Sequence, residues 1–82
     1  MMYTFVIQVD RKPGLSDPEG ATTARALHDL GFTGVEHVSF GRTITIDIDA
    51  ENSHDALATV ESMCAKLLAN PVIEHYTIDA TS

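Results

Sequence analysis

The sequence predicts an α+β fold, a two-layer sandwich in which two helices pack on one antiparallel β-sheet. Two observations support this prediction. Apolar residues alternate with polar ones near both ends and in the middle of the chain, which is typical of strands with one buried face. Between these strands lie two segments with helical spacing of apolar residues, each preceded by a capping residue. Because 82 residues suit one domain, residues 1–82 are expected to form it together.

The first predicted strand is "YTFVIQVD", residues 3–10, in which every second residue is aromatic or β-branched. The loop "KPGLSDPEG" then leads into a helix over residues 18–30. Asp17 is placed to cap this helix, and Pro18 suits its first position, where a backbone N–H would have no partner. Gly31 is placed to end the helix in a left-handed conformation.

Two further strands are predicted at residues 35–40 and 43–50, close enough to form a hairpin with Gly41 in its turn. In "TITIDIDA" three isoleucines alternate with threonine and aspartate, which is the clearest strand pattern in the chain. Asp47 and Asp49 project from the polar face of that strand. They are interpreted as solvated carboxylates rather than an acid–base or cation-binding pair, because the residues between them are buried isoleucines.

From Ser53, the predicted cap, the apolar spacing becomes helical. The predicted buried stripe of this second helix is Leu57, Val60, Cys64, Leu67 and Leu68. The helix is expected to stop at Asn70, because the residue before a proline is forced out of the α region. A last strand at residues 72–79 either completes the chain's own sheet or pairs with the edge of another subunit. The resulting order, β-α-β-β-α-β, is the ferredoxin-like arrangement.

The excess of acidic over basic residues makes some classes of binding partner unfavourable. Five Lys and Arg residues against twelve Asp and Glu residues give a formal net charge of −7, which disfavours nucleic acid and anionic membranes. No apolar run approaches the roughly 20 residues of a membrane span, and the first residues do not have the pattern of a signal peptide. A single cysteine suits a reducing compartment, so the cytoplasm is the expected location.

No segment has the pattern of a catalytic, cofactor-binding or metal-binding site, so none is predicted. In the opening loop five residues separate Gly14 from Gly20, and the lysine of a P-loop is missing, which favours a structural corner between strand and helix. Residues 53–55 are Ser, His and Asp, but adjacent residues cannot converge as a catalytic triad does. The four histidines lack the spacing of zinc ligands, and Cys64 is interpreted as a small buried apolar residue.

Three stretches, "KPGLSDPEG", "LGFTGVEHVSFGR" and "MCAKLLANPVIEHYTID", resemble the PurS family, the small subunit of phosphoribosylformylglycinamidine (FGAM) synthase. The resemblance spans nearly the whole chain and is most specific in residues 63–74. It implies a non-catalytic subunit of purine biosynthesis that joins a synthetase (PurL) to a glutaminase (PurQ) and helps ammonia pass between them. It also implies dimers or dimers of dimers, with ATP and Mg²⁺ bound by the large synthetase and no cofactor in this chain.

The resemblance also implies contacts with the partner subunits. The candidate contact residues, chosen in loops and at strand ends, are Lys12, Pro13, Gly14, Asp17, Gly41, Arg42, Asn70 and Pro71. Tyr76 and Ile78 are candidate oligomer contacts if the last strand adds to a neighbour's sheet. A small-molecule-binding regulatory module acting as a dimer is the alternative function. A small independent enzyme is a third, for which the sequence offers no catalytic residues.

Overall fold

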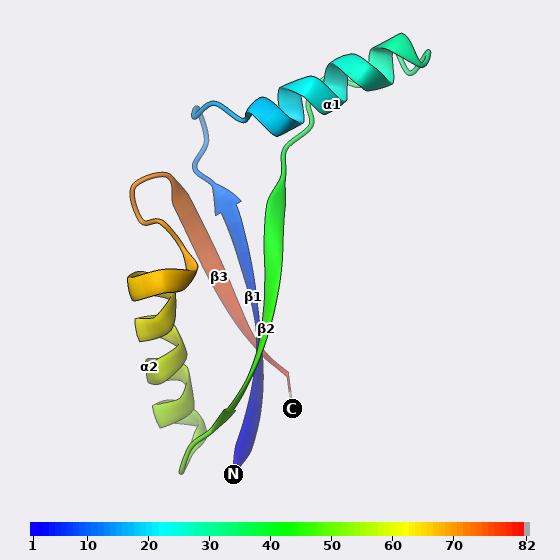
Figure 1. The fold of residues 1–82 in the computed structure, drawn as a ribbon. Helices are drawn as coiled ribbons and strands as arrows, with labels where there is room; N and C mark the ends of the chain where they lie inside the picture. Colours follow the sequence, from blue (N-terminus) through cyan, green and yellow to red (C-terminus); the bar gives the residue numbers. More distant parts are fainter. Residues whose placement is uncertain (82) are drawn as a thin grey trace.

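The structure, a computed structural model, describes residues 1–81 (Figure 1). In chain order its elements are β1 (Met2–Arg11), α1 (Pro18–Asp29), β2 (Gly41–Asp49), α2 (Ser53–Met63), the π-helical turn η1 (Cys64–Leu68) and β3 (Glu74–Thr81). The strands form one antiparallel sheet in the order β2-β1-β3, with β1 in the centre. The α+β class and the antiparallel sheet are therefore confirmed, and the last strand pairs with the chain's own β1.

The core lies between α2 and one face of the sheet. Its buried residues come from β1, α2, η1 and the residue that follows η1, and they are Phe5, Ile7, Val9, Ala56, Val60, Cys64 and Ala69. Ile7 lies at the centre, because it is in register with Ile44 of β2 on one side and Ile78 of β3 on the other. One row of isoleucines therefore crosses all three strands beneath α2.

The N-terminus of α2 differs from the prediction by one residue. Asn52, not Ser53, is the cap: its Oδ1 accepts a hydrogen bond of 2.8 Å from the backbone N–H of Asp55. Asn and Ser are about equally good caps, so local preference could not separate the two neighbours.

The buried stripe of α2 also differs from the prediction. Residues 56, 60 and 64 are buried at steps of four, and the π-helical turn then moves the stripe on by five, so that Ala69 is buried. In that turn the N–H of Ala69 donates to the carbonyl of Cys64 at 3.1 Å. Leu67 is consequently 83% exposed and lies outside the core, and Leu57 is only partly covered.

The segment from Asp17 to Phe40, here termed the arm, extends beyond the sheet (Figure 1). It contains α1 and residues 35–40, which return alongside the helix and belong to no strand of the sheet. Two contacts join its parts: Asp17 Oδ2 accepts from the N–H of Phe40 at 2.9 Å, and His28 Nε2 lies 2.5 Å from the carbonyl oxygen of Val35. Within residues 1–81, α2 is thus the helix that covers the sheet, whereas the sequence pattern predicted two.

The close approach of α1 to the returning segment depends on Gly20. Gly20 is buried, and a Cβ at this position would collide with the carbonyl oxygen of Val38. A helix without a side chain there can lie directly on the extended backbone, which explains why residues 35–40 follow α1 in this chain. None of the helices in residues 1–81 has the length and apolar composition needed to span a bilayer.

Candidate functional site

The predicted partner-contact residues converge at the end of the sheet from which the arm projects. This region, here termed the neck, is where β1 ends and where β2 and β3 begin, since Asp10 pairs with Gly41 and Arg11 with Glu74. The predicted residues at the neck are Lys12, Pro13, Gly14, Asp17, Gly41, Arg42, Asn70 and Pro71. The structure therefore gathers into one region residues that lie far apart in sequence.

Two hydrogen bonds of Lys12 join the opening loop to the loop before β3. The Lys12 Nζ donates to the carbonyl oxygen of Pro71 at 2.7 Å, and its backbone N–H donates to the carbonyl of Ile73 at 2.9 Å. Gly14 has a φ of 83°, a left-handed conformation that glycine adopts without steric cost. The opening loop is thus an ordered turn between β1 and α1, and Gly14 has a structural part in it, as the sequence analysis proposed.

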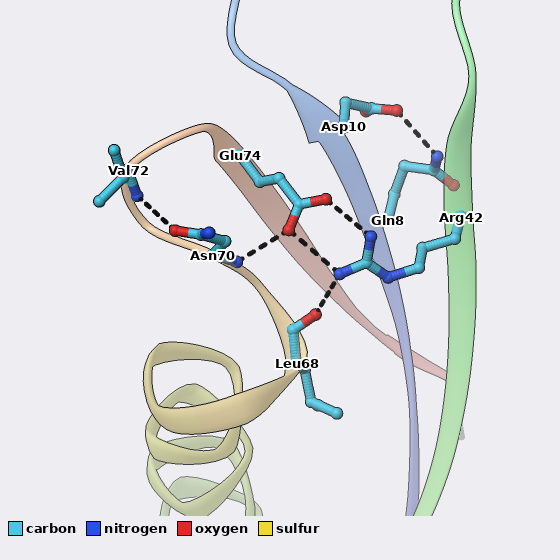
Figure 2. A network of polar contacts seen from close by, with 7 residues as sticks. All are labelled: Gln8, Asp10, Arg42, Leu68, Asn70, Val72 and Glu74. Atoms are coloured by element: carbon cyan, nitrogen blue, oxygen red, sulfur yellow. Dashed lines mark hydrogen bonds and ion pairs between the residues drawn. The ribbon is translucent and has the colours of Figure 1, made fainter. Parts of the chain in front are cut away.

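Arg42 holds three segments of the neck together (Figure 2). Its guanidinium donates to both carboxylate oxygens of Glu74, at 2.7 and 3.1 Å, and to the carbonyl oxygen of Leu68 at 2.6 Å. The Glu74 carboxylate also accepts from the backbone N–H of Asn70 at 2.8 Å, and Asn70 Oδ1 accepts from the N–H of Val72 at 3.0 Å. The network links the start of β2, the end of η1 and the start of β3.

The electrostatics of the neck follow from these contacts. The Arg42 guanidinium and, after it, the N–H of Asn70 lower the pKa of Glu74 from 4.5 to about 2. The same pairing raises the pKa of Arg42. At the arm's base, the N–H groups of Phe40 and then Gly20 lower the pKa of Asp17. The carboxylates of Glu74 and Asp17 are therefore ionised at neutral pH, and each accepts hydrogen bonds from other residues of the chain.

Gly41 is the first residue of β2 and lies opposite Asp10 of β1. A Cβ there would collide with the carboxylate of Asp10 and would lie 2.8 Å from the carbonyl oxygen of Val9. The side chain of Gln8 donates to the same Asp10 carboxylate at 3.1 Å (Figure 2). Position 41 thus requires glycine because backbone and polar side chains of β1 already fill the space.

The surface of the neck has two shallow hollows. One, of about 220 Å³, lies between the arm's base and the ion pair and includes Arg11, Glu19 and Phe40. The other, of about 270 Å³, follows the opening loop from Arg11 and Lys12 to His37. A larger apolar hollow of about 650 Å³ lies at the opposite end of the sheet, where it is lined mainly by Tyr3, Phe5, Leu57, Ile78 and Ala80. The neck hollows combine charged and apolar side chains, as a protein-contact surface does.

The carboxylates of β2 are exposed, as the alternation of its residues predicted. Asp47 accepts a hydrogen bond of 2.6 Å from the hydroxyl of Thr4, and Asp49 lies 2.8 Å from the N-terminal amine of Met1. Among residues 1–81, no group of three or more His, Cys, Asp and Glu side chains has the geometry to hold a metal ion.

Tyr76 and Ile78 face the chain's own core. They are partly buried and lie opposite Val9 and Ile7 in the register of β1 and β3. Their contact with another subunit stays a prediction, as do the partner contacts of the neck residues. Sequence reasoning missed Glu74, because its pairing with Arg42 spans β1, and only the strand order β2-β1-β3 brings the two side chains together.

These features define a class of protein: a small α+β chain with a single-layer sheet, one covering helix and a projecting arm. Residues 4–82 match the family model described as "PurS: Phosphoribosylformylglycinamidine (FGAM) synthase", and the chain belongs to this family. The predicted resemblance is thereby confirmed.

Individual relatives agree with this assignment. The phosphoribosylformylglycinamidine synthase subunit PurS of Archaeoglobus fulgidus is 44% identical over 72 residues, which cover 88% of this chain and 90% of the relative. The crystal structure of Methanocaldococcus jannaschii PurS is 42% identical, with a TM-score of 0.84 over 98% of this chain and 96% of that one. The match to the structure of PurLQS from Thermotoga maritima is 31% identical, with a TM-score of 0.89 over 99% of both chains.

Proposed function

We propose that this chain is the small subunit of an FGAM synthase and that it joins a synthetase subunit to a glutaminase subunit. The observation that supports this most strongly is the likeness, over 99% of both chains, to the chain in PurLQS from Thermotoga maritima. The Methanocaldococcus jannaschii relative is described as one of the subunits of formylglycinamide ribonucleotide amidotransferase in the purine biosynthetic pathway. An amidotransferase moves nitrogen from an amide donor to an acceptor, which requires two sites to work together.

The shape and charge of the chain suit a connecting role. It measures 52 Å along its longest axis. The neck combines basic side chains with carboxylates, whereas the opposite end of the sheet carries the exposed carboxylates of Asp49, Glu51 and Asp55. These two surfaces are separated by the length of β1, about 30 Å for ten extended residues. Two ends that carry different arrangements of charged side chains can select two different partners, because electrostatic complementarity contributes strongly to specificity.

The proposed benefit of joining the two sites is the transfer of ammonia. Ammonia released into water at neutral pH is mostly protonated, and the resulting ammonium ion has no lone pair with which to attack an acceptor. Holding donor and acceptor sites close together replaces diffusion through bulk water with a short internal transfer, and proximity of this kind can be worth several orders of magnitude in rate. In this proposal ATP and Mg²⁺ bind to the synthetase, the chain holds no cofactor, and the complex works in the cytoplasm.

The experiment that tests this function compares two nitrogen sources. The synthetase and glutaminase of the same organism are assayed for amidine formation with glutamine or with a high concentration of ammonia, with and without this chain. A connecting role predicts that omitting the chain lowers the glutamine-dependent rate and spares the ammonia-dependent rate.

A further inference from the structure

Basic residues are scarce in this chain, but they concentrate at the neck. Five residues are Lys or Arg, against twelve Asp and Glu, and three of the five are Arg11, Lys12 and Arg42 at the neck. Arg42 is neutralised by its ion pair with Glu74. Within residues 1–81 neither Arg11 nor Lys12 forms an ion pair, so two adjacent positive charges remain uncompensated in an acidic protein.

Arg11 and Lys12 line the neck hollow of about 270 Å³, here termed the loop hollow. The opening loop forms one wall, and the returning segment of the arm forms the other. The polar and charged side chains that line it are those of Arg11, Lys12, Asp17, His37 and Ser39. Two cations and one carboxylate therefore meet at this hollow, with an imidazole and a hydroxyl on the side of the arm.

The cationic side chains of the loop hollow have unused hydrogen-bond donors. Across residues 1–81 the Arg11 guanidinium forms neither an ion pair nor a side-chain hydrogen bond, and it offers several N–H donors in a planar fork. The Lys12 ammonium uses one of its donors for the carbonyl oxygen of Pro71, at 2.7 Å, and keeps the others. A ligand with several acceptor oxygens and negative charge would satisfy both groups.

The carboxylate of Asp17 does not occupy these donors. Its Oδ1 accepts from the N–H of Gly20 at 3.1 Å, and its Oδ2 accepts from the N–H of Phe40 at 2.9 Å. The pKa of Asp17 is lowered first by these N–H groups of Phe40 and Gly20 and, to a smaller extent, by the charges of Arg11 and His37. The two cationic side chains thus lie within electrostatic range of Asp17 but do not contact it.

Hydrogen bonds fix both walls of the loop hollow. The backbone N–H of Lys12 donates to the carbonyl of Ile73 at 2.9 Å, which fastens the opening loop to the segment before β3. The bond from Phe40 to Asp17 fastens the returning segment to the same loop. Because the walls are already ordered, a ligand can bind between them without a large loss of conformational entropy.

The neighbouring hollow of about 220 Å³ has the opposite charge balance. The carboxylates of Asp17, Glu19 and Glu74 line it together with Arg11 and Arg42, and Arg42 is already paired with Glu74. An anion would meet more negative than positive side chains there. The loop hollow is therefore the better of the two for an anion.

We propose that the loop hollow binds a phosphate group, carried either by inorganic phosphate or by a small phosphorylated metabolite. Arg can donate to two phosphate oxygens at once, and Lys adds a compact positive charge. The volume of about 270 Å³ lies just below the roughly 300–1,000 Å³ of small-molecule pockets, so the loop hollow suits a phosphate with a small substituent rather than a whole nucleotide. This inference is independent of the proposed function, because the chain should bind phosphate without either partner subunit.

Titration of the isotope-labelled full chain with inorganic phosphate, followed by NMR, tests the proposal. At a constant ionic strength of about 0.15 M, which screens long-range attraction, the amide signals of Gly14, His37 and Ser39 should shift to saturation with a Kd of about 1 mM or tighter. A parallel titration with glucose 6-phosphate distinguishes the two sources. Tighter binding of the sugar phosphate would assign a phosphorylated metabolite, and weaker binding would assign inorganic phosphate.

Two variants and a matched control complete the test. Arg11→Gln should lower the affinity at least about tenfold, because hydrogen bonds to charged groups are strong. His37→Ala, in a segment outside the sheet, should also weaken binding. The control is Arg25→Gln, which removes the same charge from an exposed position of α1 away from the loop hollow and should leave the affinity unchanged.

Three results would overturn the proposal. The first is a titration in which neither phosphate compound produces saturable shifts. The second is an equal loss of affinity in Arg11→Gln and Arg25→Gln, which would show general attraction to positive charge. The third is unaltered affinity in both Arg11→Gln and His37→Ala, which would place the phosphate elsewhere.

Discussion

Ile7 is the residue whose removal should damage the fold most clearly. It is fully buried, and it lies between Ile44 and Ile78 in the row of isoleucines beneath α2. Ile7→Ala removes three carbon atoms, and each buried methylene contributes about 0.8 kcal/mol. The cavity left in a central strand adds to this, so we expect a loss of about 3–4 kcal/mol of unfolding free energy. A domain of this size has only about 4–12 kcal/mol in total.

The matched control is Leu67→Ala, which removes the same number of carbon atoms from a side chain that is 83% exposed. Exposed substitutions usually change stability by no more than about 0.5 kcal/mol. Urea titration of both variants, followed by circular dichroism at one protein concentration, measures the two losses. Equal losses would contradict this reasoning, because Leu67 would then have to be buried in the stripe of α2.

Two further predictions concern carboxylates. The pKa of Glu74 is lowered to about 2, so its stabilising effect is fully present above its ordinary pKa of 4.5 and disappears as the pH falls toward 2. The unfolding free energies of wild type and Glu74→Gln should therefore converge over that range, and a constant difference would contradict the ion pair. Asp47→Asn should change the free energy of unfolding by no more than about 0.5 kcal/mol, because the carboxylate is exposed and the amide can still accept from Thr4. A rise in melting temperature with Mg²⁺ that this variant abolishes would instead identify a cation site.

Most elements could be predicted from the sequence because each has a local cause. Alternation of apolar and polar residues, interrupted at Val6, indicates β1 and β2, since both face a core on one side only. Asp17 and Pro18 indicate the start of α1, which runs over Pro18–Asp29 against the predicted 18–30. The last strand was displaced by two residues, from 72–79 to Glu74–Thr81, because residues 71–73 form a turn held by Asn70.

What could not be predicted depends on contacts distant in sequence. The pattern of residues 35–40 indicates an extended backbone but does not identify the element against which this backbone packs. In the structure these residues lie along α1, because Gly20 has no side chain to keep the carbonyl of Val38 away. The π-helical turn escapes a search for 3.6-residue spacing because it inserts one residue into the stripe. At the neck, loop residues could be selected by type, but the bond from Arg42 to Glu74 depends on the order of the strands.

The measurement that tests the proposed function most directly is the ratio of glutamine-dependent to ammonia-dependent amidine formation by the synthetase and glutaminase. If this chain joins the two sites, the ratio is high in its presence and collapses when it is omitted, while the ammonia-dependent rate stays the same. An equal loss of both rates on omission would contradict the account, because the chain would then be shaping the synthetase site itself. A ratio unchanged by omission would contradict it as well, because ammonia would then reach the acceptor without this subunit.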